Sequence, residues 1–275
     1  MSEAADNDTA IVIRNLVTRF GAREILKDIS LEIRRGETFV ILGGSGCGKS
    51  TLLRHIVGLE QPTQGQIWLQ GKDITRLSEE EFNDLRKKIG MAFQNSALFN
   101  SMTVGENVAL PLHEHTDLED STIKIMTRIK LEQVGLSGFD SFMPSQLSGG
   151  MRKRAGIARA LAMDPEILLF DEPSAGLDPI IAAGIDNLIL KLKQAFRMTI
   201  ILVTHELASA FLLADRMAML DKGKILFVGT PDEFRGCEIP RVRQFLDRQA
   251  DQESQDMEQY LRNLTQETNA REEIV

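Results

Sequence analysis

The chain has 275 residues, of which 43% are hydrophobic and 26% charged, so it can form one large folded domain with an appendage, and its composition excludes global disorder. A formal net charge of −8 argues against a broad nucleic-acid-binding surface, and two cysteines, Cys47 and Cys237, exclude a disulfide framework and fit a reducing compartment. Because the start is too acidic for a signal peptide and no apolar run approaches the ~18 residues that cross a bilayer, we expect a soluble chain that reaches a membrane only through a partner.

The first third of the sequence is typical of short strands around one glycine-rich loop. Alternation or short apolar runs predict strands over 11–20, 28–33, 37–43, 65–71 and 91–94. Helical spacing predicts a helix over 50–59. Ser78 with Glu81 three residues later is a capping box, which predicts the start of a second helix.

The middle of the sequence alternates between helices and strands. Residues 102–135 have a helical pattern that we expect to be broken at Pro111 and by the polar stretch 113–120. The remaining elements that the pattern predicts are a helix over 151–163, a buried strand over 167–173, a helix over 180–196, a buried strand over 199–206 followed by a helix, and a hairpin over 217–229 with its turn at 221–223. This order predicts a largely parallel α/β sheet, with an antiparallel patch formed by the first strands.

The composition changes near residue 248, where the sequence becomes acidic and poor in large apolar residues. We therefore expect a domain over 1–247 and a C-terminal extension over 248–275. Two interpretations of the extension stay open. It is either a solvated, frayed tail or a docking arm whose helical stripe consists of Met257, Tyr260, Leu261 and Leu264.

Residues 43–50 fit the pattern G-x-x-x-x-G-K-[ST] between a predicted strand and a predicted helix. Glycines allow successive N–H groups to turn around phosphate oxygens, and the helix adds its positive end. Lys49 is expected to reach the β and γ phosphates and Ser50 to bind Mg²⁺. The predicted nucleotide-binding set is Gly43, Gly44, Ser45, Gly46, Cys47, Gly48, Lys49, Ser50 and Thr51. Within this set Cys47 is interpreted as a small residue that fits the loop, in preference to a redox group.

A second acidic site is needed for nucleotide chemistry, and the predicted strand over 167–173 supplies two adjacent acids. Asp171 is placed to hold Mg²⁺ through water, and Glu172 to polarise an attacking water as a general base. The alternative is that both are ordinary acids at a strand end.

The segments GGSGCGKST, LSGGM and ILLFDEP, in this order and spacing, resemble the ATP-binding-cassette family. The resemblance implies a P-loop NTPase fold with a mainly parallel core sheet, an antiparallel β subdomain and an α-helical subdomain at about 95–163. It also implies a homodimer in which the turn Ser148-Gly149-Gly150 of one copy covers the ATP that the other copy holds. We call this turn the signature turn and the helix predicted after it the signature helix. Two copies would then sandwich two nucleotides.

The same resemblance implies roles for four further residues. Phe20 would stack on adenine, with a core phenylalanine as the alternative, and Gln94 would sense Mg²⁺ and the attacking water. Asp178 would lie in the loop that crosses the dimer interface, and His205 would contact the γ-phosphate. The implied catalytic residues are thus Glu172, His205 and Gln94, and the implied Mg²⁺ ligands are Ser50, Gln94 and Asp171.

In this family the region between Gln94 and the signature turn docks on a membrane partner. The resemblance implies that Ala97, Leu98, Phe99 and Met102 form a pocket for a short helix of a permease. The alternative is that these four side chains are internal packing.

Two segments closely resemble the ATPases of MCE-protein phospholipid transporters of the Mla group in Gram-negative bacteria. They are QNSALFNSMTVGENVALPLHEHT and the sequence LSGGMRKRAGIARALAMDPEILLFDEPSAGLDPI. This implies a peripheral ATPase dimer on the cytoplasmic side of the inner membrane, beneath permease subunits, with a periplasmic MCE-domain protein and a small STAS-domain protein as partners. The complex, not this chain, would handle phospholipid between the inner and outer membranes, and the extension would embrace the neighbouring ATPase.

Two alternatives to this function stay open. One is a cassette ATPase for another substrate, such as an amino acid or an organic solvent. The other is a soluble cassette ATPase without a permease, with a regulatory or nucleic-acid role. The only sequence feature that suggests nucleic-acid binding is the basic group Arg152, Lys153, Arg154 and Arg159. This group is more simply the polar side of the signature helix, so we expect no nucleic-acid partner.

Overall fold

The computed structural model of the chain describes residues 8–249. The chain divides after Phe234 into two units. The first unit contains both sheets, and the second contributes the helix α9 (Pro240–Leu246) to the described part. Most of the proposed C-terminal arm, with its stripe from Met257 to Leu264, lies outside the described residues. Among residues 8–249, no helix is long and apolar enough to cross a membrane.

An antiparallel sheet forms one part of the first unit, with the strand order β2-β1-β4-β5. Its strands are β1 (Thr9–Phe20), β2 (Arg23–Arg34), β4 (Gln64–Leu69) and β5 (Lys72–Asp73). β1 and β2 form a hairpin that turns at Gly21, where φ is +60°. This sheet confirms the antiparallel patch that the sequence predicts, although both strands of the hairpin are longer than expected.

The second sheet has the order β10-β9-β3-β8-β7-β6 and is parallel except for its β9–β10 hairpin. Its strands are β3 (Thr38–Leu42), β6 (Ile89–Ala92), β7 (Ile167–Asp171), β8 (Thr199–Thr204), β9 (Arg216–Asp221) and β10 (Lys224–Gly229). The hairpin turn is at Lys222 and Gly223, both with positive φ, as two-residue hairpin turns prefer. The structure thus confirms a mainly parallel core sheet, and it places β6 two residues before the predicted strand because Ile89 pairs with Ile167.

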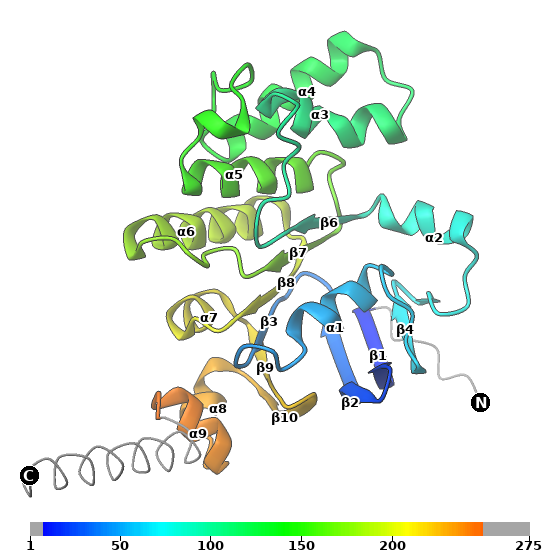
Figure 1. Ribbon diagram of the computed structural model, residues 1–275, viewed down its shortest axis with the longest axis vertical. Coiled ribbons are helices and arrows are strands. Elements are labelled where there is room, and N and C mark those ends of the chain that lie inside the picture. Colours follow the sequence, from blue (N-terminus) through cyan, green and yellow to red (C-terminus); the bar gives the residue numbers. More distant parts are fainter. Residues whose placement is uncertain (1–7, 250–275) are drawn as a thin grey trace, which may run out of the picture. The chain divides into compact units, whose positions relative to one another are not determined.

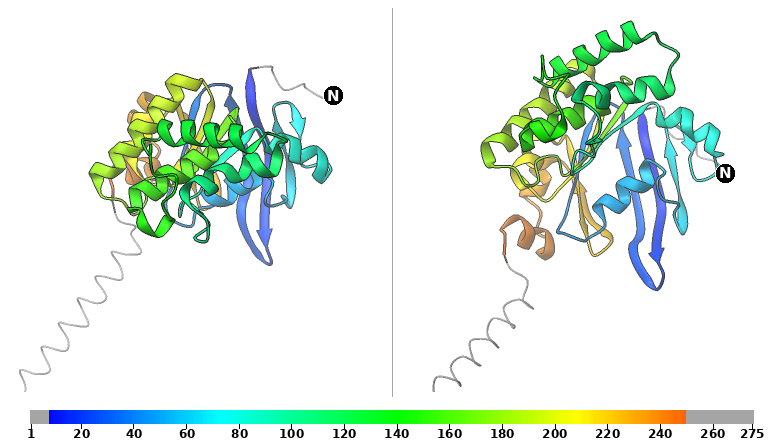
Figure 2. Two further views of the ribbon diagram at one scale, coloured as in Figure 1. Left: turned by 90° about the horizontal axis from the view of Figure 1, so that it is seen from above. Right: turned by 45° about the horizontal axis from the view of Figure 1, so that its top comes forward.

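Helices cover the sheets and form a separate cluster beyond β6 (Figure 1). Those next to the sheets are α1 (Lys49–Ile56), α2 (Glu79–Arg86), α6 (Pro179–Phe196), α7 (Leu207–Leu213) and α8 (Pro231–Arg235). The cluster comprises α3 (Val104–His115), α4 (Asp120–Gln133), the short 3-10 helix η1 (Pro144–Gln146) and α5 (Gly149–Ala160). Both views in Figure 2 keep α3, α4 and α5 together, in agreement with their mutual packing.

Two local predictions for the helices have opposite outcomes. The capping box is confirmed, because Ser78 Oγ accepts from the N–H of Glu81 and a Glu81 carboxylate oxygen accepts from the N–H of Ser78. The break at Pro111 is wrong, since Pro111 lies inside α3. Ala109 and Leu112, on either side of the proline, are buried against Ile123 of α4, and this tertiary packing outweighs the local cost of the ring.

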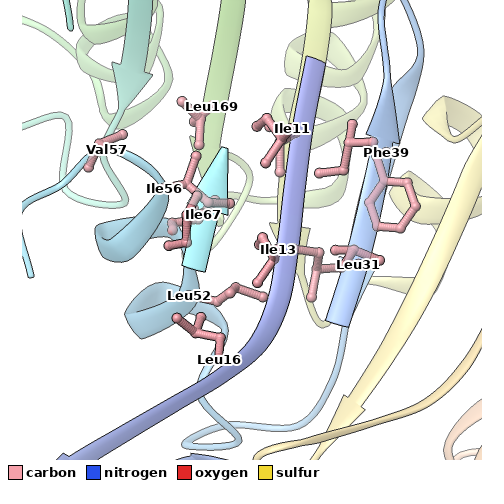
Figure 3. Close-up of a cluster of buried hydrophobic side chains, with 14 of the residues drawn as sticks. Ile11, Ile13, Leu16, Leu31, Phe39, Leu52, Ile56, Val57, Ile67 and Leu169 are labelled. Atoms are coloured by element: carbon pink, nitrogen blue, oxygen red, sulfur yellow. The ribbon is translucent and has the colours of Figure 1, made fainter. Parts of the chain in front are cut away.

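A hydrophobic core joins the two sheets to α1. Side chains from β1, β2, β3, β4, β7 and α1 meet there, among them Ile11, Ile13, Leu16, Leu31, Phe39, Leu52, Ile56, Ile67 and Leu169 (Figure 3). Burying one such side chain is worth about 1.5–3 kcal/mol. Because Leu52 and Ile56 anchor α1, the core also fixes the loop that connects β3 to this helix.

Candidate functional site

The loop from Gly43 to Gly48 connects β3 to α1, and close packing demands glycine at two of its positions. A Cβ at Gly43 would lie 2.3 Å from the carbonyl oxygen of Leu220. Gly48, the N-cap of α1, has φ +112°, and a Cβ there would lie 2.8 Å from a methyl of Leu26. No side chain caps α1, so its first N–H groups remain available for an anion.

Lys49 places a buried ammonium against this loop. The residue is only 5% exposed, and its Nζ donates to the carbonyl oxygens of Gly43 at 2.9 Å and Gly44 at 3.0 Å. The same Nζ lies 3.4 Å from Oε1 of Glu172. The positive charge is therefore held between the glycine loop and the acids at the end of β7.

The two acids of β7 have different surroundings. Asp171 Oδ1 accepts from Ser50 Oγ at 2.9 Å, and burial raises the pKa of the Asp171 carboxyl, partly offset by this hydrogen bond. Glu172 has a left-handed backbone with φ +45°, and its N–H donates to the carbonyl of Val203 at 3.0 Å. His205 Nδ1 lies 3.2 Å from Oε2 of Glu172. The Glu172 carboxylate is thus fixed between Lys49 and His205.

The signature turn lies at the N-terminus of α5 and packs on α6. Ser148 is exposed, and its Oγ accepts from the N–H of Met151 at 3.3 Å. A Cβ at Gly150 would lie 2.5 Å from a methyl of Ile181. Asp178 caps α6 by accepting from the N–H groups of Ile180 and Ile181. The neighbours that the structure gives this turn are therefore on α5, on α6 and at Leu177 just before α6, not on the phosphate loop.

The structure joins some of the predicted site residues in one connected group, while others lie outside that group. Lys49, Ser50, Asp171, Glu172 and His205 form one connected group. Ser45 and Gly46 are exposed on the glycine loop, while Thr51 is half-buried on α1. Phe20, at the end of β1, is 53% exposed, so the alternative of a core phenylalanine does not hold. Gln94 is exposed after β6, and Asp178 is exposed at the start of α6.

The sequence predicts that the basic residues of α5 form the polar side of that helix. In the structure, each of them donates a hydrogen bond to a backbone carbonyl. Lys153 Nζ donates to the carbonyl of Gln94 and, at 3.3 Å, to that of Glu172. Arg152 donates to Leu147, Arg154 to Val134, and Arg159 to Ser96 and Ala97. Burial lowers the pKa of Lys153 and of Arg159. The sequence signal for this role was the spacing of Lys153, Gly156 and Arg159, which places all three on one helix face.

A groove of about 650 Å³ lies between α2, β6, the segment after Gln94, and α3. Its apolar lining includes Met91, Phe93, Ala97, Phe99, Leu110, Pro111 and Met163. Of the predicted docking residues, Ala97 and Phe99 line this groove, whereas Met102 lines a different cavity, between α3 and α4. Phe99 is 52% exposed, so its ring is not internal packing.

The fully buried Asn107 fixes the loop that presents Phe99. Its side chain accepts from the N–H of Phe99 at 2.7 Å and donates to the carbonyls of Phe99, Met102 and Thr103. One amide thus bonds to three residues of a five-residue loop, and it holds the exposed ring of Phe99 at the groove.

Comparison with known proteins identifies the family. Residues 26–175 match the ABC transporter family, and the chain belongs to that family. It is an ATP-binding subunit of the P-loop NTPase class, and ATP hydrolysis is its activity. The predicted α/β cassette fold, with its antiparallel β subdomain, is confirmed.

Relatives with printed functions cover most of the chain. The intermembrane phospholipid transport system ATP-binding protein MlaF of Haemophilus influenzae is 41% identical over 89% of this chain and 93% of its own length. MlaF of Escherichia coli K12 is 42% identical over 84% of this chain and 86% of its own. A probable ribonucleotide transport ATP-binding protein, mkl of Mycobacterium leprae, is 42% identical over 86% of this chain and 68% of its own.

Solved structures agree with this assignment. A dimeric ATP-binding cassette in a post-hydrolysis state, bound to ADP and phosphate, has a TM-score of 0.74 and 32% identity, over 80% of this chain and 98% of its own. The cassette cbiO1 from Clostridium perfringens, part of an ABC transporter complex, has a TM-score of 0.76 and 30% identity, over 87% of this chain and 99% of its own.

Proposed function

We propose that this chain is the ATP-hydrolysing subunit of a transporter that moves phospholipids between the inner and outer membranes. The observation that carries the cargo assignment is similarity to two phospholipid-transport ATP-binding proteins over most of the chain. The hydrolytic part of the proposal rests on Glu172, whose carboxylate is held between Lys49 and His205.

In the proposed reaction, the loop 43–48 and the N-terminus of α1 bind the phosphates of ATP. Lys49 contacts the β and γ phosphates. Glu172 accepts a proton from the water that attacks the γ-phosphorus, while His205 orients the carboxylate through its contact at 3.2 Å. Gln94, carried on the segment after β6, contacts the same water. Phe20, exposed beside the hairpin turn, stacks on the adenine.

Ser50 and Asp171 fit a Mg²⁺ ion that accompanies the nucleotide. Mg²⁺ takes few protein oxygens besides phosphates and waters, and a hydroxyl and a carboxylate 2.9 Å apart are suited to that role, with Gln94 as a third ligand. Among residues 8–249, no group of three or more His, Cys, Asp or Glu side chains could hold a metal alone, so the phosphates would complete the site. When bound, the ion would neutralise negative charge on the phosphates of the nucleotide.

Two copies of the chain form the working unit in this proposal. At the N-terminus of α5, the Ser148 hydroxyl, which caps the helix by accepting from Met151, and the N–H groups of Gly149 and Gly150 offer neutral donors to an anion held by a second copy. In the dimer, this turn covers the ATP on Lys49 of the partner, and Asp178 lies at the interface.

The groove beside Phe99 receives a short helix of a permease on the cytoplasmic side of the bacterial inner membrane, where the ATPase is peripheral. An MCE-domain periplasmic protein and a small STAS-domain protein complete the complex, and nucleic acid takes no part. Residues 1–247 form the ATPase domain, with the helical subdomain at about 95–163, and the extension 248–275 docks on the neighbouring ATPase.

Affinity purification of the tagged chain from membranes tests this function. We expect permease, MCE-domain and STAS-domain proteins to co-elute with phospholipid, and the complex to move labelled phospholipid between vesicles only when ATP is hydrolysed. A complex that carries no phospholipid, or whose ATPase responds instead to an amino acid, a solvent or a ribonucleotide, would contradict the cargo assignment.

A further inference from the structure

One face of α5 donates hydrogen bonds to the segment that follows β6. Lys153, Gly156 and Arg159 are three residues apart and so lie on the same side of the helix. Lys153 Nζ donates to the carbonyl of Gln94, and Arg159 donates to those of Ser96 at 3.0 Å and Ala97 at 2.7 Å. Between them, a Cβ at Gly156 would lie 3.2 Å from Ser96, so the helix and the segment are in close contact.

The segment that follows β6 has a backbone conformation that its own residues do not favour. Ser96 and Ala97 both have positive φ, at +61° and +49°, although neither is glycine. Such a conformation persists only where surrounding structure determines it. Lys153 and Arg159 provide that determination from a single helix, through hydrogen bonds to the carbonyls of Gln94, Ser96 and Ala97.

Lys153 also reaches the other half of the hydrolytic site. Its Nζ donates to the carbonyl of Glu172 at 3.3 Å, so one ammonium joins the backbone of Gln94 to that of Glu172. Glu172 is itself in a left-handed conformation, with φ +45°. Hydrogen bonds from a charged donor are shorter and stronger than neutral ones, and Lys153 is half-buried.

We propose that Lys153 is a positioning residue for ATP hydrolysis, whose ammonium holds Gln94 and Glu172 in mutual register through their backbone carbonyls. The proposal rests on the function assigned above, in which these two side chains flank the attacking water. Lys153 need not touch ATP or the water. It fixes the backbone positions of Gln94 and Glu172, whose side chains contact the attacking water.

The test compares variants of the full chain in its purified complex. Lys153→Met removes the donor at similar length, and Lys153→Arg keeps a cation that can donate to both carbonyls. Arg154→Met is the matched control, because it removes a cation from the same helix that bonds to a carbonyl outside the site, that of Val134 at 3.1 Å. For each variant, kcat and KM for ATP, binding of a fluorescent ATP analogue and the melting temperature are measured.

We expect Lys153→Met to lower kcat by roughly tenfold to a hundredfold, as misplacement of reacting groups does. KM for ATP and analogue binding should stay within about twofold of the wild type, since no contact with nucleotide is removed. Lys153→Arg should restore most of kcat, and Arg154→Met should keep it even where its melting temperature falls as much as that of Lys153→Met.

Three outcomes would overturn the proposal. They are a normal kcat in Lys153→Met, a rise in KM with kcat unchanged, and an equal loss of kcat in Lys153→Met and Arg154→Met. Glu172→Gln separates this failure from failure of the assigned function. If Glu172→Gln keeps normal turnover, the base assignment itself fails, whereas an inactive Glu172→Gln beside a normal Lys153→Met removes only the role of Lys153.

Discussion

Two helices in this chain begin at glycine-rich segments, and the surroundings of their N-termini differ in charge. The N-terminus of α1 lies beside the buried ammonium of Lys49 and the acids Asp171 and Glu172. The N-terminus of α5 offers the exposed hydroxyl of Ser148, with apolar neighbours from α6. Ile180, at the start of α6, is 86% exposed. In the function proposed above, the first end holds the charged ligand and activates water, whereas the second only covers that ligand.

Loss of the proposed general base at the first end should have the strongest consequence. Glu172→Gln should lower ATP turnover by about 10²–10⁴-fold, because the amide cannot accept the proton of the attacking water. ATP binding should remain, since Lys49 and the glycine loop are intact. Phosphate release and equilibrium binding of ATP are the measurements. Lys49→Ala is the companion variant and should lose binding itself, and a Glu172→Gln variant with normal turnover would remove the base assignment.

Mixing two variant subunits tests whether the two helix ends serve the same nucleotide. Ser148→Glu adds a negative charge at the N-terminus of α5 and should lower turnover at least tenfold without weakening binding at Lys49. As homodimers, Lys49→Ala and Ser148→Glu are each expected to have at most about a tenth of wild-type turnover. Mixed in equal amounts, they should recover about a quarter of wild-type turnover, since half of the dimers carry one intact composite site. No recovery after confirmed subunit exchange would argue against shared sites.

The loop over residues 99–103, which we propose contacts the permease, offers a variant with a smaller effect that leaves both helix ends intact. Asn107→Ala removes one buried amide that bonds to the backbone of Phe99, Met102 and Thr103. We expect the free energy of unfolding to fall by about 1–3 kcal/mol, the usual cost of unsatisfied buried backbone groups. Stimulation of ATPase activity by the permease should fall further than basal turnover. Equal losses in both would mean that the loop has no special part in docking.

Local sequence signals predicted the parts of this fold that depend on neighbouring residues. The capping box at Ser78 and the hairpin turn at Lys222 and Gly223 need only a few consecutive residues. The buried strands β7 and β8 were predictable because parallel strands covered on both faces consist of continuous apolar residues.

Features that depend on distant partners were not predictable in the same way. Pro111 stays helical because α4 packs against its neighbours. The carbonyl partners of Lys153 lie 59 and 19 residues away in the sequence, and the positive φ of Ser96, Ala97 and Glu172 occurs without glycine. The pairing of the signature turn with a nucleotide came from family resemblance, since the chain's own contacts of Ser148 and Gly150 are with α5 and α6.

The smallest expected effect is on the reactivity of Cys47, within the loop at the first end. Burial raises the pKa of its thiol, and the nearby Lys49 only partly opposes this. Because the thiolate is the reacting form, alkylation by iodoacetamide should be slow at neutral pH and should increase at a higher pH than for an ordinary thiol. Bound ATP should slow the alkylation further, because its phosphates on the loop would block access of the reagent to the thiol. Mass spectrometry of the labelled peptide gives the rate, and Cys237, outside the loop, is the internal control. Equal labelling of Cys47 with and without ATP would place the phosphates elsewhere than on residues 43–48.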